Sequence, residues 1–114
     1  MSERSVNFDL FVFVLQRVTG ALLALLLLIH LITIMYAVQG QISVSEIIGR
    51  VRGNIAWIIF YGVFIVTVVV HATIGLRNIL TEMTSLNRRL IDLTVTLYAA
   101  FTLVLGAEAI KAIW

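Results

Sequence analysis

The residues best suited to chemistry in this sequence are His71, Gly75, Arg77 and Asn78, which lie within eight positions of a long apolar run. An ionisable side chain inside such a run lies in hydrocarbon, where it needs a partner and marks a candidate functional site. Gly75 removes a side chain one turn after His71, so a flat group can approach the backbone. Imidazole, bare helix surface and guanidinium together predict a haem site. The same residues also fit a hydrogen-bonded histidine, a packing glycine and an interfacial arginine.

These residues belong to a polar stripe on one helix. At 3.6 residues per turn, its members project within roughly 40 degrees of one direction. The preceding apolar run carries a similar polar stripe on one side, so both helices are expected to turn these faces toward protein rather than lipid. The first stripe consists of Phe64, Thr67, His71, Gly75, Asn78 and Glu82. The stripe on the preceding run consists of Gln16, Thr19, His30 and Thr33.

His30 and His71 are the only histidines, and their depths decide whether they can serve one iron. In two antiparallel spans rising 1.5 Å per residue, His30 lies roughly 30 Å and His71 roughly 16 Å from the same side. Two axial ligands, each about 2 Å from one iron, cannot bridge that difference. If both ligate, an outer haem at His30 and an inner haem at His71 each take their second ligand from another chain or a second copy. His30 also fits an ordinary packed helix.

The composition is that of a membrane bundle and not of a soluble domain. The chain has 114 residues, 61% hydrophobic and 12% charged, with no proline and no cysteine, and its mean hydropathy is +1.10. Without cysteine this chain can form no disulfide and ligate no iron-sulfur cluster. The net charge of +2 comes from dispersed basic residues near the ends of apolar runs. Membrane topology explains them, so no nucleic-acid partner is expected.

The apolar pattern predicts an all-α membrane protein with one domain, residues 1–114, and three transmembrane helices at about 10–36, 55–80 and 90–113. Residues 39–54 have the composition of a loop, with an apolar spacing that suits a short amphipathic helix on the membrane surface. A cytoplasmic N-terminus places the larger basic set inside, as the positive-inside rule expects. The inner set is Arg4, Arg17, Arg77, Arg88 and Arg89, and the outer set is Arg50, Arg52 and Lys111.

Two segments resemble the cytochrome b membrane-anchor subunits of succinate:quinone oxidoreductase, the succinate dehydrogenase and fumarate reductase complexes. The first is residues 16–20, with the sequence Gln-Arg-Val-Thr-Gly. The second begins at His71 and continues with Gly75, Arg77 and Glu82. Three spans in a chain of this length also match these anchors, which pack with a second anchor subunit into a larger helical bundle.

The resemblance implies roles for individual residues. His71 matches an axial ligand of haem b, and Arg17 and Arg77 match arginines near the haem propionates or the quinone pocket. His30 resembles the helix I histidine of the di-haem branch, which binds a second haem near the outer face. Phe13, Gln16, Asn78 and Glu82 depart from the pattern of ubiquinone-reducing anchors, so the quinone site is expected to lie mainly on the partner anchor. Its expected edge on this chain is Gln16, Arg17, Asn78 and Glu82.

The resemblance further implies a subunit of an enzyme complex that performs no succinate chemistry itself. Such a chain holds a flavoprotein and an iron-sulfur subunit to the cytoplasmic face of a prokaryotic plasma membrane. It passes electrons between the clusters and quinone, with one or two haems b shared with a partner chain. The expected docking surface is Arg77, Glu82, Arg88 and Arg89, although topology alone accounts equally well for Arg88 and Arg89.

Three alternatives remain open from the sequence. One is a haem-bearing subunit of another respiratory dehydrogenase. Another is a small three-helix transporter or proton-translocating subunit that uses Asp92 or Glu108 as an intramembrane carboxylate. Both acids are expected near the ends of the third span and not at its midpoint, which argues against this reading. The third is a purely structural anchor without haem.

Overall fold

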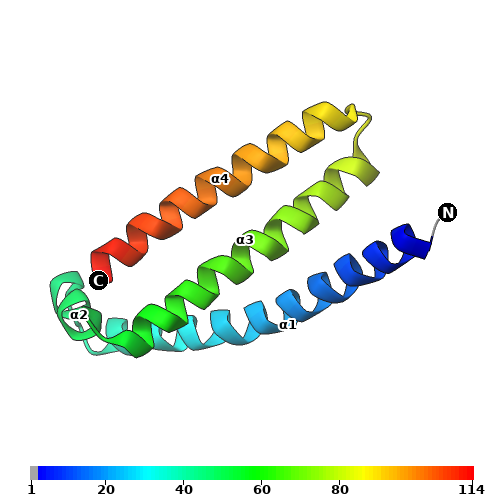
Figure 1. The fold of residues 1–114 in the computed structure, drawn as a ribbon. Coiled ribbons are helices and arrows are strands. Elements are labelled where there is room, and N and C mark those ends of the chain that lie inside the picture. The colour runs from blue at the N-terminus through cyan, green and yellow to red at the C-terminus, as the bar shows by residue number, and fades with distance from the viewer. Residues whose placement is uncertain (1–2) are drawn as a thin grey trace.

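The computed structural model describes residues 3–114, which fold into four α-helices (Figure 1). They are α1 (Glu3–Gln39), α2 (Val44–Val51), α3 (Ile55–Met83) and α4 (Arg88–Ile113). Three of these helices, α1, α3 and α4, are long and apolar enough to cross a membrane. The predicted all-α membrane fold with three spans is therefore confirmed.

The first helix extends beyond the predicted span of about 10–36 at both ends, because α1 begins at Glu3, ends at Gln39 and has 37 residues. No glycine or proline interrupts residues 3–9, and Glu3 in the first turn complements the helix dipole. About 20 residues suffice to cross the hydrocarbon core, so a helix of 37 residues is longer than the crossing requires. The other spans also extend slightly further than predicted, since α3 ends at Met83 and α4 begins at Arg88.

The helix starts follow from capping side chains. Before α2, the Ser43 hydroxyl accepts from the Glu46 amide at 3.3 Å and the Glu46 carboxylate accepts from the Ser43 amide at 3.2 Å, which forms a capping box. Asn54 and Asn87 supply the amide oxygens that cap α3 and α4. The amphipathic helix predicted within residues 39–54 is confirmed as α2.

The third helix, α3, is central, because it packs against both α1 and α4. Figure 1 shows α1 and α4 diverging toward the end where α1 begins and where α3 turns into α4. We call this the Arg77 end and the opposite one the α2 end. At the α2 end the Gly53 amide donates to the Ile113 carbonyl at 2.9 Å, which ties the start of α3 to the end of α4.

Close packing of α3 and α4 depends on a glycine. A Cβ atom placed on Gly106 would lie 2.5 Å from Cγ2 of Ile65. The backbone of α4 therefore approaches Ile65 more closely than any residue with a side chain allows.

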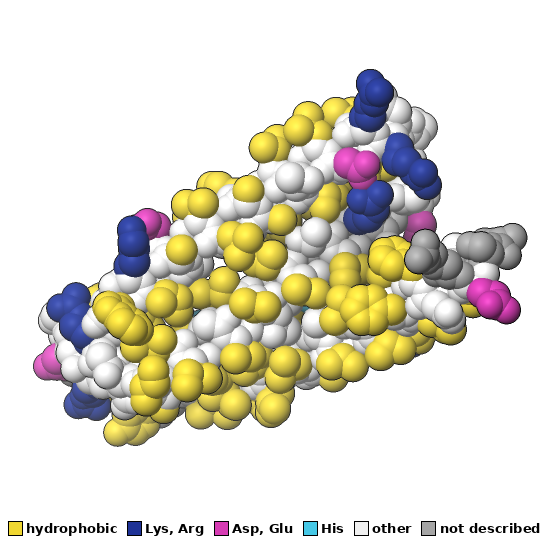
Figure 2. Space-filling view, in the orientation of Figure 1, with side chains coloured by type: hydrophobic (Ala, Val, Ile, Leu, Met, Phe, Trp, Pro, Cys, Tyr) yellow, Lys and Arg dark blue, Asp and Glu magenta, His cyan; other side chains and the backbone are white. Residues whose placement is uncertain are grey.

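Very little of the chain is buried within itself. The buried apolar side chains are Leu26, Ile91 and Val95, and the buried polar ones are Thr19 and Thr67. Figure 2 shows hydrophobic side chains along the length of the visible face, with charged side chains gathered toward the two ends. Lipid or partner chains must cover this surface. The predicted packing with a second anchor subunit agrees with this exposure and stays a prediction.

Candidate haem and quinone sites in the helix seam

The polar stripes predicted on the first two spans face each other in the structure. Thr19 of α1 contacts His71 of α3, and His30 of α1 contacts Tyr61 of α3. Between α1 and α3, Gly75 lies against Gln16, whose Nε2 atom is 3.3 Å from the position that a Cβ on Gly75 would take. The two helices are antiparallel, so rising positions on α1 meet falling positions on α3. We call this contact the seam.

His71 is held by a hydroxyl of the facing helix. Its Nδ1 atom lies 3.2 Å from Oγ1 of Thr19, and a Cβ on Gly20 would come within 3.2 Å of its Cε1 atom. Gly20 thus provides the space in which the imidazole lies against α1. On another side, His71 and Gly75 line a shallow groove of about 380 Å³ that reaches Tyr98 of α4. Gly75 therefore lies both at the contact with Gln16 of α1 and on this open surface.

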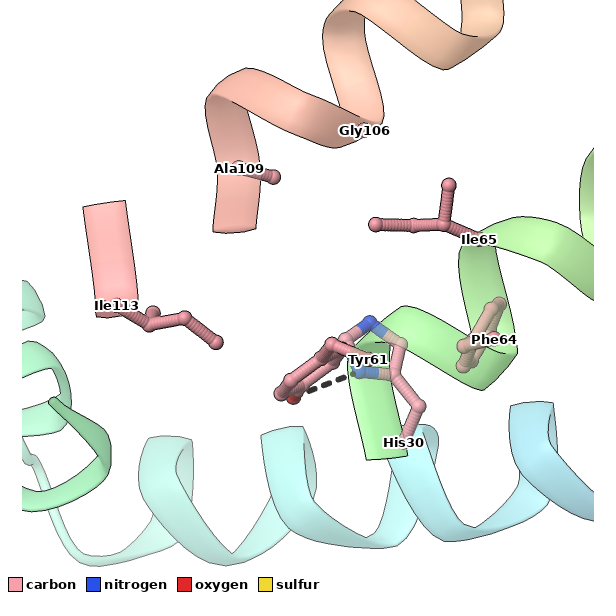
Figure 3. A pocket seen from close by; sticks show the side chains of 7 residues that line it. All are labelled: His30, Tyr61, Phe64, Ile65, Gly106, Ala109 and Ile113. Atoms are coloured by element: carbon pink, nitrogen blue, oxygen red, sulfur yellow. Dashed lines mark hydrogen bonds between the residues drawn. The ribbon is translucent and has the colours of Figure 1, made fainter. Parts of the chain in front are cut away.

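His30 lies among aromatic rings. Its Nδ1 atom is 3.3 Å from the Tyr61 hydroxyl, and its ring meets Tyr61 and Phe64 edge-on at centroid distances of 5.7 and 5.6 Å. The imidazole extends into a cavity of about 320 Å³, and its other nitrogen points away from the Tyr61 hydroxyl (Figure 3). This cavity is lined by His30, Tyr61, Phe64, Ile65, Gly106, Ala109 and Ile113.

The two histidines lie at different depths along the seam. His30 is opposite Tyr61, which is ten positions before His71 on α3. Ten residues of α-helix extend about 15 Å, which agrees with the separation expected from the sequence. One iron cannot take both imidazoles at this distance.

A larger groove lies between α1 and α3 near the Arg77 end. Its volume is about 710 Å³, and it brings together Gln16 and Asn78, two of the residues expected at a quinone site. The Oε1 atom of Gln16 is buried and has no hydrogen-bond partner among residues 3–114, so it is able to accept a hydrogen bond. The groove is lined by Phe8, Asp9, Val12, Phe13, Gln16, Ile74, Arg77 and Asn78.

Phe8 and Asp9 were missed by sequence reasoning because the first span was expected to begin after them. A signal was present: Asp9, Phe13 and Gln16 follow the spacing i, i+4 and i+7, which places them on one helical face. The extension of α1 to Glu3 makes that face continuous.

The other two residues expected at the quinone site lie beside the groove. The side chain of Arg17 is exposed, with its guanidinium carbon 5.4 Å from the ring centre of Phe13. Glu82 lines a neighbouring cavity of about 400 Å³ that it shares with Arg77, Asn78 and Arg88. The structure therefore brings Gln16, Arg77 and Asn78 together and leaves Arg17 and Glu82 at the margin.

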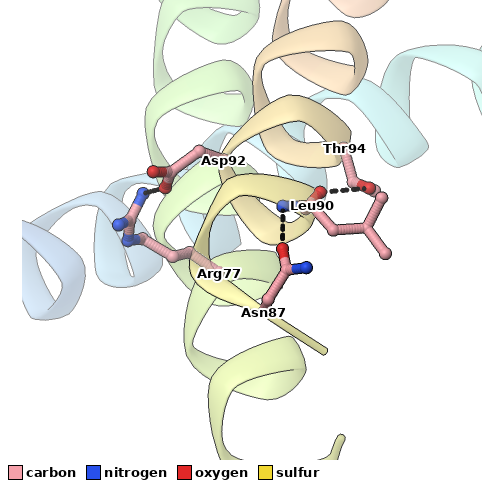
Figure 4. A network of polar contacts seen from close by, with 5 residues as sticks. All are labelled: Arg77, Asn87, Leu90, Asp92 and Thr94. Carbon is pink, nitrogen blue, oxygen red and sulfur yellow. Dashed lines mark hydrogen bonds and ion pairs between the residues drawn. The ribbon is translucent and has the colours of Figure 1, made fainter. Parts of the chain in front are cut away.

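Arg77 pairs with an acid that sequence reasoning did not connect to it. Its Nη1 atom is 2.6 Å from Oδ1 of Asp92 on α4, and both side chains are about half exposed (Figure 4). The two residues lie at similar distances from the turn between α3 and α4, which was a usable signal. Glu108, the other acid of α4, pairs with Lys111 at 3.2 Å. Both carboxylates considered for proton translocation are therefore ion-paired.

These features define a class: an integral membrane protein with three spans, whose first two long helices meet along a polar seam that carries two imidazoles. Comparison with known families is more specific. The chain belongs to the family of succinate dehydrogenase/fumarate reductase transmembrane subunits, which matches residues 4–107. No curated protein and no solved structure matches the sequence. Family membership confirms the expected resemblance and favours a subunit of this enzyme complex over a transporter or a subunit of another dehydrogenase.

Proposed function

We propose that this chain is a haem b-binding anchor that carries electrons between the iron-sulfur subunit of the complex and quinone. The observation that carries the proposal is the setting of His71. Its Nδ1 atom is held by the Thr19 hydroxyl, and no hydrogen bond among residues 3–114 engages its Nε2 atom. Histidine ligands of metals usually have one ring nitrogen held by the protein, which leaves the other for the metal.

The surroundings of His71 fit a flat cofactor. Gly20 leaves room for the ring beside α1, and the groove at His71 and Gly75 provides a bare helix surface. When bound there, haem supplies a one-electron carrier whose potential depends on its ligands and burial. His71 would hold the iron from this chain, and a residue of the partner anchor would supply the other protein ligand. Arg77, with five N–H donors of which one faces Asp92, retains donors for a propionate.

His30 is proposed as the ligand of a second haem. Its imidazole is likewise held at Nδ1, by Tyr61, and its other nitrogen faces the cavity between α3 and α4. The separation of about 15 Å along the seam gives two electron-carrying positions at different depths. Haems held at both positions would form a path for electrons across the membrane.

The groove at Gln16 and Asn78 is proposed as the quinone-binding region of this chain. The amide groups of these residues and the guanidinium of Arg77 can donate hydrogen bonds to quinone carbonyl oxygens. The unpartnered Oε1 of Gln16 can accept from a quinol hydroxyl. Phe8 and Phe13 supply apolar surface for the ring. Arg17 and Glu82 form its outer edge.

The proposed topology places the N-terminus and the Arg77 end in the cytoplasm of a prokaryote. This orientation puts most basic residues inside, where Arg77, Glu82, Arg88 and Arg89 serve as the docking surface for the iron-sulfur and flavoprotein subunits. The extensive exposed apolar surface of the three spans supports a second anchor subunit as a further partner.

The test is a haem count on the complex purified in detergent, by pyridine haemochrome and by the reduced-minus-oxidised spectrum. Two haems b per complex are expected. His71→Leu should remove one of them and His30→Leu the other, whereas Thr33→Val, on the same face of α1, should keep both. A wild-type complex without haem would reduce the chain to a structural anchor, and a full count in His30→Leu would refute the second haem.

A further inference from the structure

The hydrogen bonds of Thr19 determine which nitrogen of His71 carries the proton. A threonine hydroxyl has one hydrogen to donate and two lone pairs that accept. Oγ1 of Thr19 lies 2.7 Å from the Leu15 carbonyl oxygen and 3.2 Å from that of Gln16. Carbonyl oxygens only accept, so the hydroxyl hydrogen is committed to the backbone of α1. Toward His71, Oγ1 therefore acts as the acceptor, and Nδ1 of His71 is the donor.

A neutral imidazole that carries its proton on Nδ1 has its lone pair on Nε2. This lone pair is the form that binds a metal. We propose that Thr19 is a positioning residue for the haem, because its hydroxyl fixes His71 in this tautomer and orients Nε2 for the iron. The inference rests on the proposed function, in which haem binds at His71, and it adds to it a residue of α1 that never touches the haem iron.

The position of Thr19 strengthens the effect. Thr19 is buried, with 8% of its surface exposed, and a hydrogen bond is stronger in such an apolar setting than in water. Gly20, the next residue, keeps the edge of the imidazole close to α1. Rotation of the ring would leave the Nδ1 proton without its acceptor beside the buried Thr19, which is unfavourable. The ring is thus fixed both by a hydrogen bond and by the space that Gly20 leaves.

This hydrogen bond also affects the electron affinity of the site. An imidazole that donates from Nδ1 is a stronger electron donor at Nε2, and stronger donation favours the oxidised metal. Thr19 is a neutral acceptor, so it supplies this effect without introducing a charge into the membrane. Removal of the hydroxyl should therefore favour the ferrous form.

The experiment is a redox titration of the haems in the purified complex, comparing wild type with Thr19→Val. Valine keeps the branched shape and removes the hydroxyl. At a fixed ambient potential, the ferric-to-ferrous ratio of the haem assigned to His71 should fall by up to about tenfold, equivalent to about 59 mV for one electron. Thr19→Ser, which retains the hydroxyl, should restore the wild-type value. Thr33→Val is the matched control, since Thr33 also bonds to its own helix, at the Ile29 carbonyl oxygen.

Two outcomes separate this inference from the proposed function. A Thr19→Val complex with full haem and an unchanged potential and spectrum would overturn the role of Thr19 and leave haem binding intact. A His71→Leu complex with full haem would instead overturn haem binding at His71. If Thr19→Val yields no assembled complex, Thr19→Ala removes the same hydroxyl with a smaller side chain, and the same titration decides.

Discussion

The sites at His71 and His30 are built by the same two helices in opposite ways. At His71, α3 provides the imidazole and α1 the hydroxyl of Thr19; at His30, α1 provides the imidazole and α3 the hydroxyl of Tyr61. The Thr19 hydroxyl already donates to its own backbone. No second hydrogen bond of the Tyr61 hydroxyl is seen among residues 3–114.

The distances from the hydroxyl oxygen to Nδ1 are similar at the two sites, 3.2 Å at His71 and 3.3 Å at His30, but the chemistry differs. Thr19 can only accept from His71, so one tautomer is fixed. Tyr61 can either donate to Nδ1 of His30 or accept from it. In the proposed haem sites, His71 would therefore be preorganised for ligation through Nε2, whereas His30 would be so only when Tyr61 accepts. Preorganisation lowers the cost of binding, so we expect the His71 site to hold haem more tightly.

Gly20→Val should have the largest effect on the difference between the His71 and His30 sites. A single Cβ at Gly20 already lies 3.2 Å from His71, and the two further methyl groups of valine would displace the ring. Haem at the His71 site should fall by about tenfold or more, while haem at His30 stays. The haem count per complex and the spectrum measure this. Gly62→Val is the control, because a Cβ at Gly62 meets nothing within 4 Å; full haem in Gly20→Val would contradict the role of that space.

Gly106→Ala tests the helix contact beside the His30 cavity. Its Cβ would lie 2.5 Å from Ile65, and such overpacking costs about 1–3 kcal/mol. At this separation the cost should exceed the roughly 0.5–1 kcal/mol that alanine gains over glycine in a helix. The melting temperature of the complex in detergent should fall, and adding Ile65→Val should restore part of it. A melting temperature unchanged or raised, as expected for Gly62→Ala, would show that α3 and α4 pack less closely here.

Tyr61→Phe tests whether the Tyr61 hydroxyl affects His30 as much as the Thr19 hydroxyl affects His71. It keeps the ring and removes the hydroxyl 3.3 Å from His30. The free energy of unfolding should therefore fall by about 1 kcal/mol or less. In a redox titration, the haem assigned to His30 should shift less than the haem at His71 shifts in Thr19→Val. A larger shift would reverse the comparison and make Tyr61 the more important partner.

Asp92→Asn should have a smaller effect than the three changes above. The pair with Arg77 is about half exposed, and ion pairs of this kind contribute about 0.2–1 kcal/mol, less at high salt. The melting temperature should change slightly at low ionic strength, and both haems should remain. Glu108→Gln, in a more exposed pair, is the control and should change less. Loss of haem in Asp92→Asn would show that the ion pair also supports the His71 site.

Much of the seam could be predicted from the sequence because helical periodicity places polar residues on definite faces. Gln16, Thr19 and His30 on one helix and His71 and Gly75 on the next were expected to face protein, and they meet in the structure. The individual partners could not be predicted. Thr19 and His71 are 52 positions apart, and their pairing depends on how far one helix slides along the other.

The ends of the helices were predicted less well for a different reason. Hydrophobicity marks where a helix lies in lipid, whereas backbone hydrogen bonds continue into polar residues such as those before Leu10. The partners Arg77 and Asp92 were missed because each was considered on its own helix.

The length of α1 has a mechanical consequence. The first glycine of the chain is Gly20 and there is no proline, so nothing interrupts the helix between Glu3 and Thr19. A stiff rod transmits tilt along its length. A peripheral subunit docked on the first turns of α1, at the Arg77 end, would therefore move the Thr19 hydroxyl relative to His71 without contacting either residue.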